Sequence, residues 1–561
     1  MSELDLEQLK RDSRGLRGTI AESLEDDTTG GISETNLPLL KFHGLYQQDD
    51  RDLRAERREA RLEPLHSFMI RIRLPGGVAT NEQWQAIDAL ADEVANTTLR
   101  ITTRQTIQYH GVFKEGLRTL MQRLDSVNLD SIAACGDVNR NVVCHVQPDA
   151  SPVHEQTLNA AREISRYFLP KTQAWREIWV NGKRVDADVN EEETIYGDTY
   201  MPRKFKIGIA LPPVNDIDVY SQDLGFIAIP NADNTALEGY NLVVGGGMGC
   251  THGELHTYPR LGNVIGFFTP EHLIPVAEAV LGIQRDHGNR EDRKQARFKY
   301  TVDRLGADWI EAEVNKRAGI TLAPAQEYTF TQNGDRYGWI EQQDGRWQLT
   351  VFVENGRLLP KHREGINQIV AQYAGDIRLT TNQNLIVAGV AAEHREAVDA
   401  LIEASGLGSK AASAIRLNAM ACVALPTCGL AMAESERYLP SLLTKIEALA
   451  ERHGIEEEPI TIRMTGCPNG CARPFLSEIA FVGRAPGRYN MYLGAAFDGS
   501  RLNKLYLDNV GEEAILTAVD ELFGRYSQER ESGEHFGDFL VRVGVVAGVN
   551  HGSEVHREAQ A

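Results

Sequence analysis

Four of the chain's seven cysteines form two spaced pairs late in the sequence, and thiols so arranged are ligands for metal chemistry. The pairs are Cys422 with Cys428, five residues between them, and Cys467 with Cys471, three residues between them. Soft thiolates favour zinc or an iron–sulfur cluster, and four of them are what a cubane cluster requires. Structural zinc usually takes closer pairs, so the wider gap favours a cluster. Cysteines that only fill a core would not be expected in two such pairs.

The three remaining cysteines, Cys135, Cys144 and Cys250, are each isolated in the sequence. A lone cysteine is more often a small buried residue than a ligand, so we expect no site role for these three. Cys250 also stands where a dinucleotide-binding glycine motif would end, and no Walker-type phosphate loop occurs. We therefore expect no nucleotide or flavin site on this chain, and electrons for redox chemistry would come from another protein.

Cationic residues gather in strand-like runs in the first half of the chain. Because side chains alternate faces along a strand, residues two apart point the same way. The residues that share such faces are Arg71 with Arg73, Arg100 with Arg104, Gln108 and His110, and Lys204 with Lys206, while Arg140 lies in the run 137–141. Taken singly, each charge would lie on a solvated strand face. Taken together, they predict a pocket that binds anions.

Two sections of the chain recur in the same order, which indicates an internal duplication. Residues 99–107 resemble residues 377–385, and each stretch is followed shortly by Gly-Val. Further on, residues 226–245 are echoed by residues 479–494. The order A-B-A′-B′ predicts a two-part unit that is present twice, with pseudo-twofold symmetry.

The two copies differ in the residues that carry charge. Arg104 corresponds to Asn382 and His110 to Ala388, so the second copy lacks these cations, while its half carries the four paired thiols. Duplication followed by specialisation explains both facts. One half is predicted to bind anions and the other to bind metal.

Mixed periodicities place these residues on a framework of helices and strands. Apolar spacing predicts helices at residues 81–95, 272–286, 395–404 and 441–453, and strands at 68–74 and 349–353. We expect an α+β fold with mixed sheets, an internally duplicated unit whose cofactors bind at the interface between domains. The first 65 residues carry dense charge of both signs and little apolar periodicity, so folded structure should begin at Ser67.

The overall charge narrows the classes of partner. Lys and Arg number 59 against 79 Asp and Glu, a net charge of −20, which argues against nucleic acid. No apolar run approaches the roughly 18 residues that span a bilayer, and the acidic first residues lack the features of a signal peptide. We expect a cytoplasmic protein, in a compartment where thiols stay reduced.

The motifs taken together resemble those of the sirohaem-containing sulfite and nitrite reductases. The four-cysteine pattern, with Thr465-Gly466 before the second pair and residues 478–481 after it, carries the resemblance. Further matching stretches are residues 41–48, 100–111, 137–141, 202–206 and 485–490. Within that family, residues 16–546 are most similar to the haemoprotein (beta) subunits of assimilatory, NADPH-dependent sulfite reductase.

The resemblance implies two cofactors and a set of residues for each. A [4Fe-4S] cluster would be bound by Cys422, Cys428, Cys467 and Cys471, and Cys471 would also be the axial ligand of the sirohaem iron. The residues that would surround bound sulfite are Arg71, Arg140, Lys204 and Lys206. The residues that would lie near the macrocycle or its carboxylates are Arg100, Arg104, Gln108, His110 and Asn469.

The resemblance also implies an activity, the six-electron reduction of sulfite to sulfide in assimilatory sulfur metabolism and cysteine biosynthesis. Electrons would come from an NADPH-oxidising flavoprotein (alpha) subunit, with ferredoxin as the alternative donor. Two other hypotheses stay open: a sirohaem nitrite reductase that forms ammonia, and a non-enzymatic four-cysteine metal scaffold. The scaffold hypothesis leaves the cationic strands without a purpose.

The resemblance and the repeats divide the chain into five segments. These are an N-terminal extension that is a candidate for partner docking (1–65), a first ferredoxin-like half-domain (66–145), a first sirohaem- and substrate-binding domain (146–345), a second ferredoxin-like half-domain (346–414), and a domain for the cluster and sirohaem (415–561).

Overall fold

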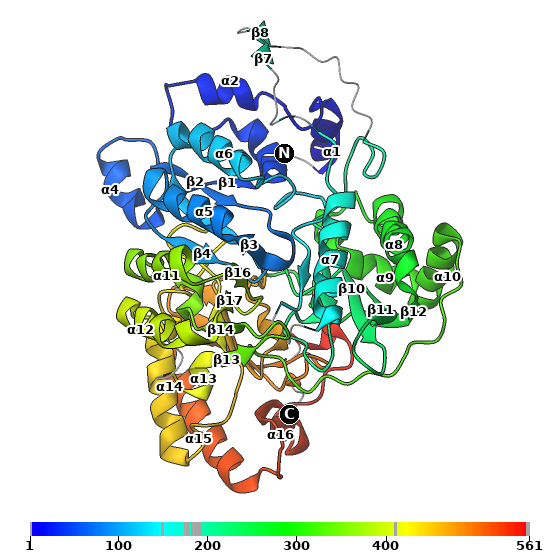
Figure 1. Ribbon diagram of the computed structural model, residues 1–561, viewed down its shortest axis with the longest axis vertical. Helices are drawn as coiled ribbons and strands as arrows, with labels where there is room; N and C mark the ends of the chain where they lie inside the picture. Colours follow the sequence, from blue (N-terminus) through cyan, green and yellow to red (C-terminus); the bar gives the residue numbers. More distant parts are fainter. Residues whose placement is uncertain are drawn as a thin grey trace.

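Four five-stranded sheets form the framework, and they occur as two matched pairs (Figure 1). The computed structural model describes residues 3–146, 151–172, 174, 179–180, 183–184, 193–408 and 412–556. A further short hairpin, β7 (Trp179–Val180) with β8 (Lys183–Arg184), lies outside the four sheets. Across the described ranges no helix is both long and apolar enough to cross a membrane.

The first matched pair of sheets exchanges strands between the two copies. One sheet has the order β1 (Leu45–Asp49), β2 (His66–Arg71), β5 (Ile107–Val112), β4 (Leu99–Ile101), β15 (Arg357–Leu358). The other has the order β13 (Gly338–Glu341), β14 (Trp347–Val351), β17 (Leu385–Val390), β16 (Asp376–Leu379), β3 (Val78–Thr80). Each copy thus completes the other's sheet: β15 pairs with β4, and β3 pairs with β16. This reciprocity fixes the two copies to each other.

The second matched pair of sheets shares one mixed topology. One sheet runs β6 (Val143–Cys144), β9 (Ile207–Ala210), β10 (Leu224–Pro230), β11 (Leu237–Val244), β12 (Asn263–Phe268). Its counterpart runs β18 (Ala419–Ala421), β19 (Ile462–Thr465), β20 (Ile479–Ala485), β21 (Arg488–Leu493), β22 (Lys504–Val510). In each, the first three strands are parallel and the last two pair antiparallel. The predicted duplicated α+β fold with mixed sheets is confirmed.

The helices pack around these sheets in groups that follow the duplication (Figure 1). The first copy has α5 (Asn81–Glu93), α6 (Leu117–Ser126), α7 (Pro152–Tyr167), α8 (Leu273–His287), α9 (Phe298–Leu305) and α10 (Ala307–Ala318). The second has α11 (Pro360–Gln372), α12 (Arg395–Ser405), α13 (Ala414–Leu417), α14 (Leu439–His453), α15 (Glu512–Glu529) and α16 (Phe536–Arg542). The four predicted helices correspond to α5, α8, α12 and α14, and the two predicted strands to β2 and β14. These elements are confirmed.

The segment before residue 66 is part of the folded body, so the expectation that folding begins at Ser67 is wrong. Its elements are α1 (Glu3–Asp12), α2 (Ile20–Glu25), α3 (Leu37–Leu40), β1 and α4 (Arg54–Glu59). Leu16 and Leu39 are fully buried in the main core, and β1 pairs along β2. Lys10 is buried, with its Nζ 2.7 Å from Glu7 and 3.4 Å from Asp137. Some of the charges are therefore paired inside the protein, which composition alone does not reveal.

The stretch from Arg100 to His110 also differs from expectation, because it is a hairpin rather than one strand. β4 ends at Ile101 and β5 begins at Ile107, and Gln105 between them has a positive φ of 51°. Arg104 is therefore on a turn and does not share a strand face with Arg100. Arg73, expected beside Arg71, is instead paired with Asp130 at 2.8 Å.

Candidate active site

The four paired cysteines leave one edge of the last sheet. β18 and β19 are parallel neighbours, with Ala421 opposite Met464. Cys422 directly follows β18, and Cys467 lies just beyond β19. Because the carboxyl ends of parallel strands share an edge, the loops that carry all four thiols start from the same place.

Hydrogen bonds orient two of these thiols. The backbone N–H of Gly466 donates to Cys422 Sγ at 3.3 Å, and the side-chain amide of Asn469 donates to Cys471 Sγ at 3.6 Å. Cys471 is exposed, whereas Cys467 is buried and the other two are half-buried. Cys471 is thus the thiol most open to a further group.

The four thiols share one electrostatic environment. Burial and the neighbouring Cys471 and Cys428 raise the pKa of Cys422 to about 12. Burial also raises the pKa of Cys467, with Cys471, Cys422 and Cys428 adding to the effect. Four thiolates in one place need a compensating positive charge, which a bound metal supplies.

The arrangement of donors fits a cluster better than a single ion. Within the described part of the chain, no three His, Cys, Asp or Glu side chains are grouped so that one metal ion could bind among them. A single zinc ion would need sulfurs about 2.3 Å from one point. Thiols that influence each other without closing around one ion suit a larger iron–sulfur cluster.

A row of polar residues crosses the first sheet on one face. Arg71 on β2 lies opposite Gln108 on β5, and Gln108 lies opposite Arg100 on β4. Residues opposite each other in antiparallel strands point to the same face, and His110 joins them two residues further along β5. With its amide oxygen toward Arg71, Gln108 accepts from Arg71 Nε at 3.2 Å.

Several nitrogen atoms of this region are buried without a partner. Among the described residues, Arg100 Nη1, Arg104 Nε and His110 Nδ1 make no hydrogen bond. Burial lowers the pKa of Arg100 to about 10, and burial with the charge of Arg473 lowers that of Arg104 to about 9. Burial, with Arg357, Arg100 and Arg71 nearby, lowers the pKa of His110 well below its ordinary value, so its ring is neutral. Buried cationic donors left unpaired are costly, so the free nitrogens of Arg100 and Arg104 fit a ligand that brings carboxylates.

Two lysines lie on either side of Phe205, which forms a bridge with Asn139. Lys204 Nζ donates to the side-chain oxygen of Asn469 at 3.4 Å, which ties it to the Cys471 loop. Burial, with Arg104 and Arg297 nearby, lowers the pKa of Lys206 to about 7. Burial and neighbouring cations likewise lower the pKa of Lys204.

The thiol of Cys471 links the cations to the cysteines. Cys471 acts electrostatically on Arg71, Lys204 and Lys206. Arg140, whose Nε donates to Gly136 O at 2.8 Å, has the opposite effect on Arg104 and lowers its pKa, because both side chains are cations. The structure therefore brings together residues that lie hundreds of positions apart in the sequence.

Sequence reasoning missed three residues that touch this site. Cys135 was expected to be incidental, yet its Sγ lies 2.9 Å from Arg71 Nη1. Arg297 forms a buried ion pair with Asp223 at 2.9 Å and, together with Arg203, lowers the pKa of Lys204 after the larger effect of burial. Two of them had a usable signal in the sequence: Cys135 lies just before the run 137–141, and Arg203 lies within the run 202–206. Cys144 and Cys250 are buried as expected.

A duplicated α+β fold, four converging thiols and a set of buried cations define a protein that binds a thiolate-ligated cluster beside an anion site. Residues 160–322 match the family described as "Nitrite and sulphite reductase 4Fe-4S domain". Residues 62–127 and 340–405 each match "Nitrite/Sulfite reductase ferredoxin-like half domain". The two half-domain matches fall on the two strand-exchanged sheets.

Full-length relatives give a closer comparison. The chain is 54% identical over 556 residues to the "Sulfite reductase [NADPH] hemoprotein beta-component" of Staphylococcus haemolyticus, covering 98% of this chain and 97% of that one. Proteins of the same name from Anoxybacillus flavithermus and Shewanella loihica are also 54% identical, with 97–98% of this chain and 97% of each relative covered. The chain belongs to the nitrite and sulfite reductase family.

A solved structure shares the fold at much lower identity. The Mycobacterium tuberculosis NirA protein superposes with a TM-score of 0.78 at 23% identity, covering 95% of each chain. This likeness supports the duplicated architecture alone.

Proposed function

We propose that this chain is the haemoprotein subunit of an assimilatory sulfite reductase, which reduces sulfite to sulfide with six electrons and supplies sulfide for cysteine biosynthesis. One observation carries the proposal: Asn469 donates to Cys471 Sγ at 3.6 Å and accepts from Lys204 Nζ at 3.4 Å, so that the Cys471 thiol is joined to the cations as well as to the four-cysteine group. A redox centre and an oxyanion site therefore meet at one residue.

The residues fit a cluster and a carboxylate-rich macrocycle. Cys422, Cys428, Cys467 and Cys471 would bind a [4Fe-4S] cluster, and the exposed Cys471 would also hold the sirohaem iron. Together, sirohaem and the cluster would supply low-potential electrons at an iron that binds the substrate. The residues that would bind the macrocycle or its carboxylates are Arg100, Arg104, Gln108, His110 and Asn469.

The cationic residues of this chain would donate protons and stabilise negative charge at the substrate. Arg71, Arg140, Lys204 and Lys206 would bind the sulfite oxygens and stabilise the negative charge that grows as electrons arrive. Each oxygen must leave as water, so protons are needed at the substrate. Lys206 has a pKa lowered to about 7, mainly by burial, which suits a group that gives up protons near neutral pH.

The test compares two oxyanions in a steady-state assay with a chemical electron donor. We expect sulfite to be turned over to sulfide with a larger kcat/KM than nitrite. A much larger kcat/KM for nitrite would show that the site belongs to a nitrite reductase instead. No turnover of either oxyanion by a fully loaded protein would contradict both functions.

The proposed electron donor is an NADPH-oxidising flavoprotein, with ferredoxin as the alternative. The donor would approach the loop that carries Cys428, where Leu430 is 66% exposed. The N-terminal segment borders this loop: Arg51 Nη1 donates to Ala431 O at 2.7 Å and to Cys428 O at 3.2 Å. We propose that this loop and the segment around Arg51 form the docking surface, in a cytoplasmic complex whose reducing surroundings keep the thiols free.

Exchanging Leu430 for glutamate tests the docking surface. Leu430→Glu should slow sulfite reduction by the flavoprotein about tenfold, because it places a charge in the contact, and should leave the rate with a small chemical donor unchanged. Trp309→Glu, which alters a partly exposed residue on α10, is the matched control. Equal rates for Leu430→Glu and wild type with the flavoprotein would place the donor elsewhere.

A further inference from the structure

Two residues of opposite charge stand at equivalent places in the two copies. Asp218 precedes the short 3-10 turn η6 (Val219–Ser221) and then β10, and Arg473 precedes η11 (Pro474–Leu476) and then β20 at the same spacing. Both have left-handed backbones, φ 48° and ψ 62° for Asp218, φ 53° and ψ 50° for Arg473. The duplicated frame has kept the conformation and changed the charge.

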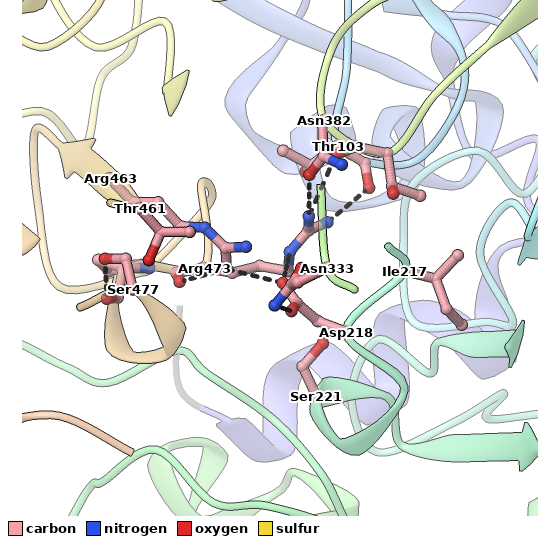
Figure 2. Close-up of polar contacts among 12 residues, drawn as sticks. Thr103, Ile217, Asp218, Ser221, Asn333, Asn382, Thr461, Arg463, Arg473 and Ser477 are labelled. Atoms are coloured by element: carbon pink, nitrogen blue, oxygen red, sulfur yellow. Dashed lines mark hydrogen bonds and ion pairs between the residues drawn. The ribbon is translucent and has the colours of Figure 1, made fainter. Parts of the chain in front are cut away.

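These two residues form a buried ion pair (Figure 2). Asp218 Oδ2 lies 2.5 Å from Arg473 Nε and 2.7 Å from Arg463 Nη1. The side chain of Asp218 is fully buried, and those of Arg463 and Arg473 are 2% and 7% exposed. A buried guanidinium needs such a partner, because a lone buried charge is strongly destabilising.

The guanidinium of Arg473 also joins the two equivalent hairpin turns. Its Nη1 donates to Thr103 O at 3.2 Å and its Nη2 donates to Thr381 O at 3.1 Å. Thr103 and Thr381 correspond in the repeat of residues 99–107 and 377–385. Figure 2 shows the guanidinium reaching toward Thr103 and Asn382, the latter accepting from Nη2 at 3.5 Å. One side chain thus lies where the two copies meet.

The same turns hold the loops that precede Asp218 and Arg473. Thr103 Oγ1 donates to Cys471 O at 3.1 Å, and Thr381 Oγ1 donates to Asp216 O at 2.6 Å. Cys471 and Asp216 are again equivalent, each two residues before its charged partner. Thr103 is therefore bonded to the Cys471 loop twice. Its hydroxyl donates to Cys471 O, and its carbonyl accepts from Arg473. Arg104 directly follows it on the turn.

We propose that Arg473 is a positioning residue of the reductase site, which holds the turn that carries Arg104 against the loop that carries Cys471, with Asp218 as its counter-charge. The role rests on the proposed function, because Arg104 and Cys471 are the groups it places around sirohaem. Arg473 acts on the site by holding Thr103, the residue directly before Arg104.

Arg473→Met tests the proposal, and Arg463→Met is the matched control. Both variants remove a guanidinium from Asp218, but among the described residues the side chain of Arg463 donates to Asp218 and to Arg473 O and to neither turn. In hydrogen exchange on the purified holoprotein, Arg473→Met should speed exchange in both turns, residues 102–106 and 380–384. Arg463→Met should leave both turns as in wild type.

A spectroscopic and kinetic readout separates positioning from general stability. Arg473→Met should shift the sirohaem electron paramagnetic resonance g values and lower kcat with a chemical donor about a hundredfold, as expected for misplacement near 1 Å. Arg473→Lys keeps the charge but has one nitrogen to donate, so its g values and kcat should lie between those of Arg473→Met and wild type. It takes the place of Arg473→Met in the test if that variant does not fold.

Two results would overturn the proposal: unchanged turns and g values in Arg473→Met and Arg473→Lys, or equal changes in Arg463→Met. A wild-type protein without sulfite turnover would instead contradict the proposed function, while the hydrogen-exchange comparison would still test whether Arg473 holds the two turns.

Discussion

The two hairpin turns of the duplicated frame, residues 102–106 and 380–384, are equivalent but differ in the hydrogen-bond partners of their polar side chains. In the second copy, Asn382 donates to Asp335 Oδ1 at 3.0 Å, and Thr380 and Asn384 donate to Asp335 Oδ2 at 2.6 and 2.8 Å. In the first copy, Arg104 donates to Gln222 and to the carbonyls of Asn141 and Ile207, yet its Nε has no partner within the described residues. Asp335 thus accepts from three side chains of the second turn, whereas the first turn keeps a cationic donor, Arg104 Nε, for a ligand.

The loops that meet these turns differ in the same way. Cys471 is exposed and faces the cations of the site. Its counterpart Asp216 is fully buried, with Oδ2 3.0 Å from His145 Nδ1. The comparison teaches that a duplicated frame becomes a single site where one copy carries a thiol and a cation, while the other carries a carboxylate paired with His145 and a neutral amide paired with Asp335.

The largest effect is expected from replacing Cys471, the thiol that one of the two equivalent loops has and the other lacks. Cys471→Ser should abolish sirohaem retention and sulfite turnover, because the variant lacks the proposed axial sulfur. Absorbance in the Soret region, per folded chain, measures the loss. Asp216→Asn alters the equivalent residue and should keep the full haem content. A Cys471→Ser protein with a complete haem spectrum and activity would remove the axial assignment.

A substitution on the substrate side should act on turnover alone. Lys206→Ala is expected to lower kcat/KM for sulfite about 10²- to 10³-fold, the usual loss for a donor aimed at developing charge, while iron and haem contents stay at wild-type values. Lys316→Ala, an exposed lysine on α10, is the control. Unchanged kinetics in Lys206→Ala would exclude it from the site.

Exchanging the turn residues between the copies tests the comparison itself. Arg104→Asn gives the first turn the residue of the second and should weaken sirohaem retention about tenfold or more, as loss of a charged hydrogen bond predicts. The reciprocal Asn382→Arg should weaken retention less, because Asn382 bonds to Asp335 and meets the Cys471 loop through one long contact, 3.5 Å from Arg473 Nη2. Equal effects of the two exchanges would mean that the copies are not specialised at this position.

The smallest expected effect is a pH dependence of stability, and it concerns a second pair of equivalent residues, Asp223 and Glu478. Asp223 and Glu478 directly precede β10 and β20, but Asp223 is paired with Arg297, whereas Glu478 accepts backbone hydrogen bonds from Thr461 and Gly537 at 2.8 and 2.9 Å. Burial raises the pKa of Glu478 to about 7 from 4.5. Its contribution to stability is present below pH 4.5 and is lost as the pH rises through about 7.

Melting temperatures between pH 5 and pH 8 measure this dependence. Wild type should lose about 2–4 °C relative to Glu478→Gln across that range, because glutamine does not ionise. Parallel curves for the two proteins would show that Glu478 stays neutral throughout or ionises without penalty.

The sequence predicted the duplication, the α+β class and the main helices because each rests on local periodicity or on a direct repeat. It grouped the four thiols as cluster ligands from their spacing, but it could not predict that they lie at one sheet edge, since β18 and β19 meet by tertiary packing. The Arg104 turn was misread because alternation of polar residues continues through a tight hairpin. The guanidinium of Arg473 donates to Thr103 and to Thr381. No local sequence pattern connects these three residues, so the contact could not be predicted.

Residues 1–65 show a further limit of composition. Dense charge predicts a solvated segment when its partners are unknown, yet Lys10 is enclosed by Glu7 and Asp137. The five segments proposed from the sequence, and the four boundaries between them, stay predictions.

Cofactor content per chain tests the central claim most directly, that one of two equivalent loops makes the site. Metal and haem analysis of the purified protein should find one sirohaem and about five iron atoms per chain, four in the cluster and one in the haem, with a haem-type Soret band. Zinc in place of iron with no Soret band would contradict the reductase, and two sirohaems per chain would contradict the specialisation of the copies.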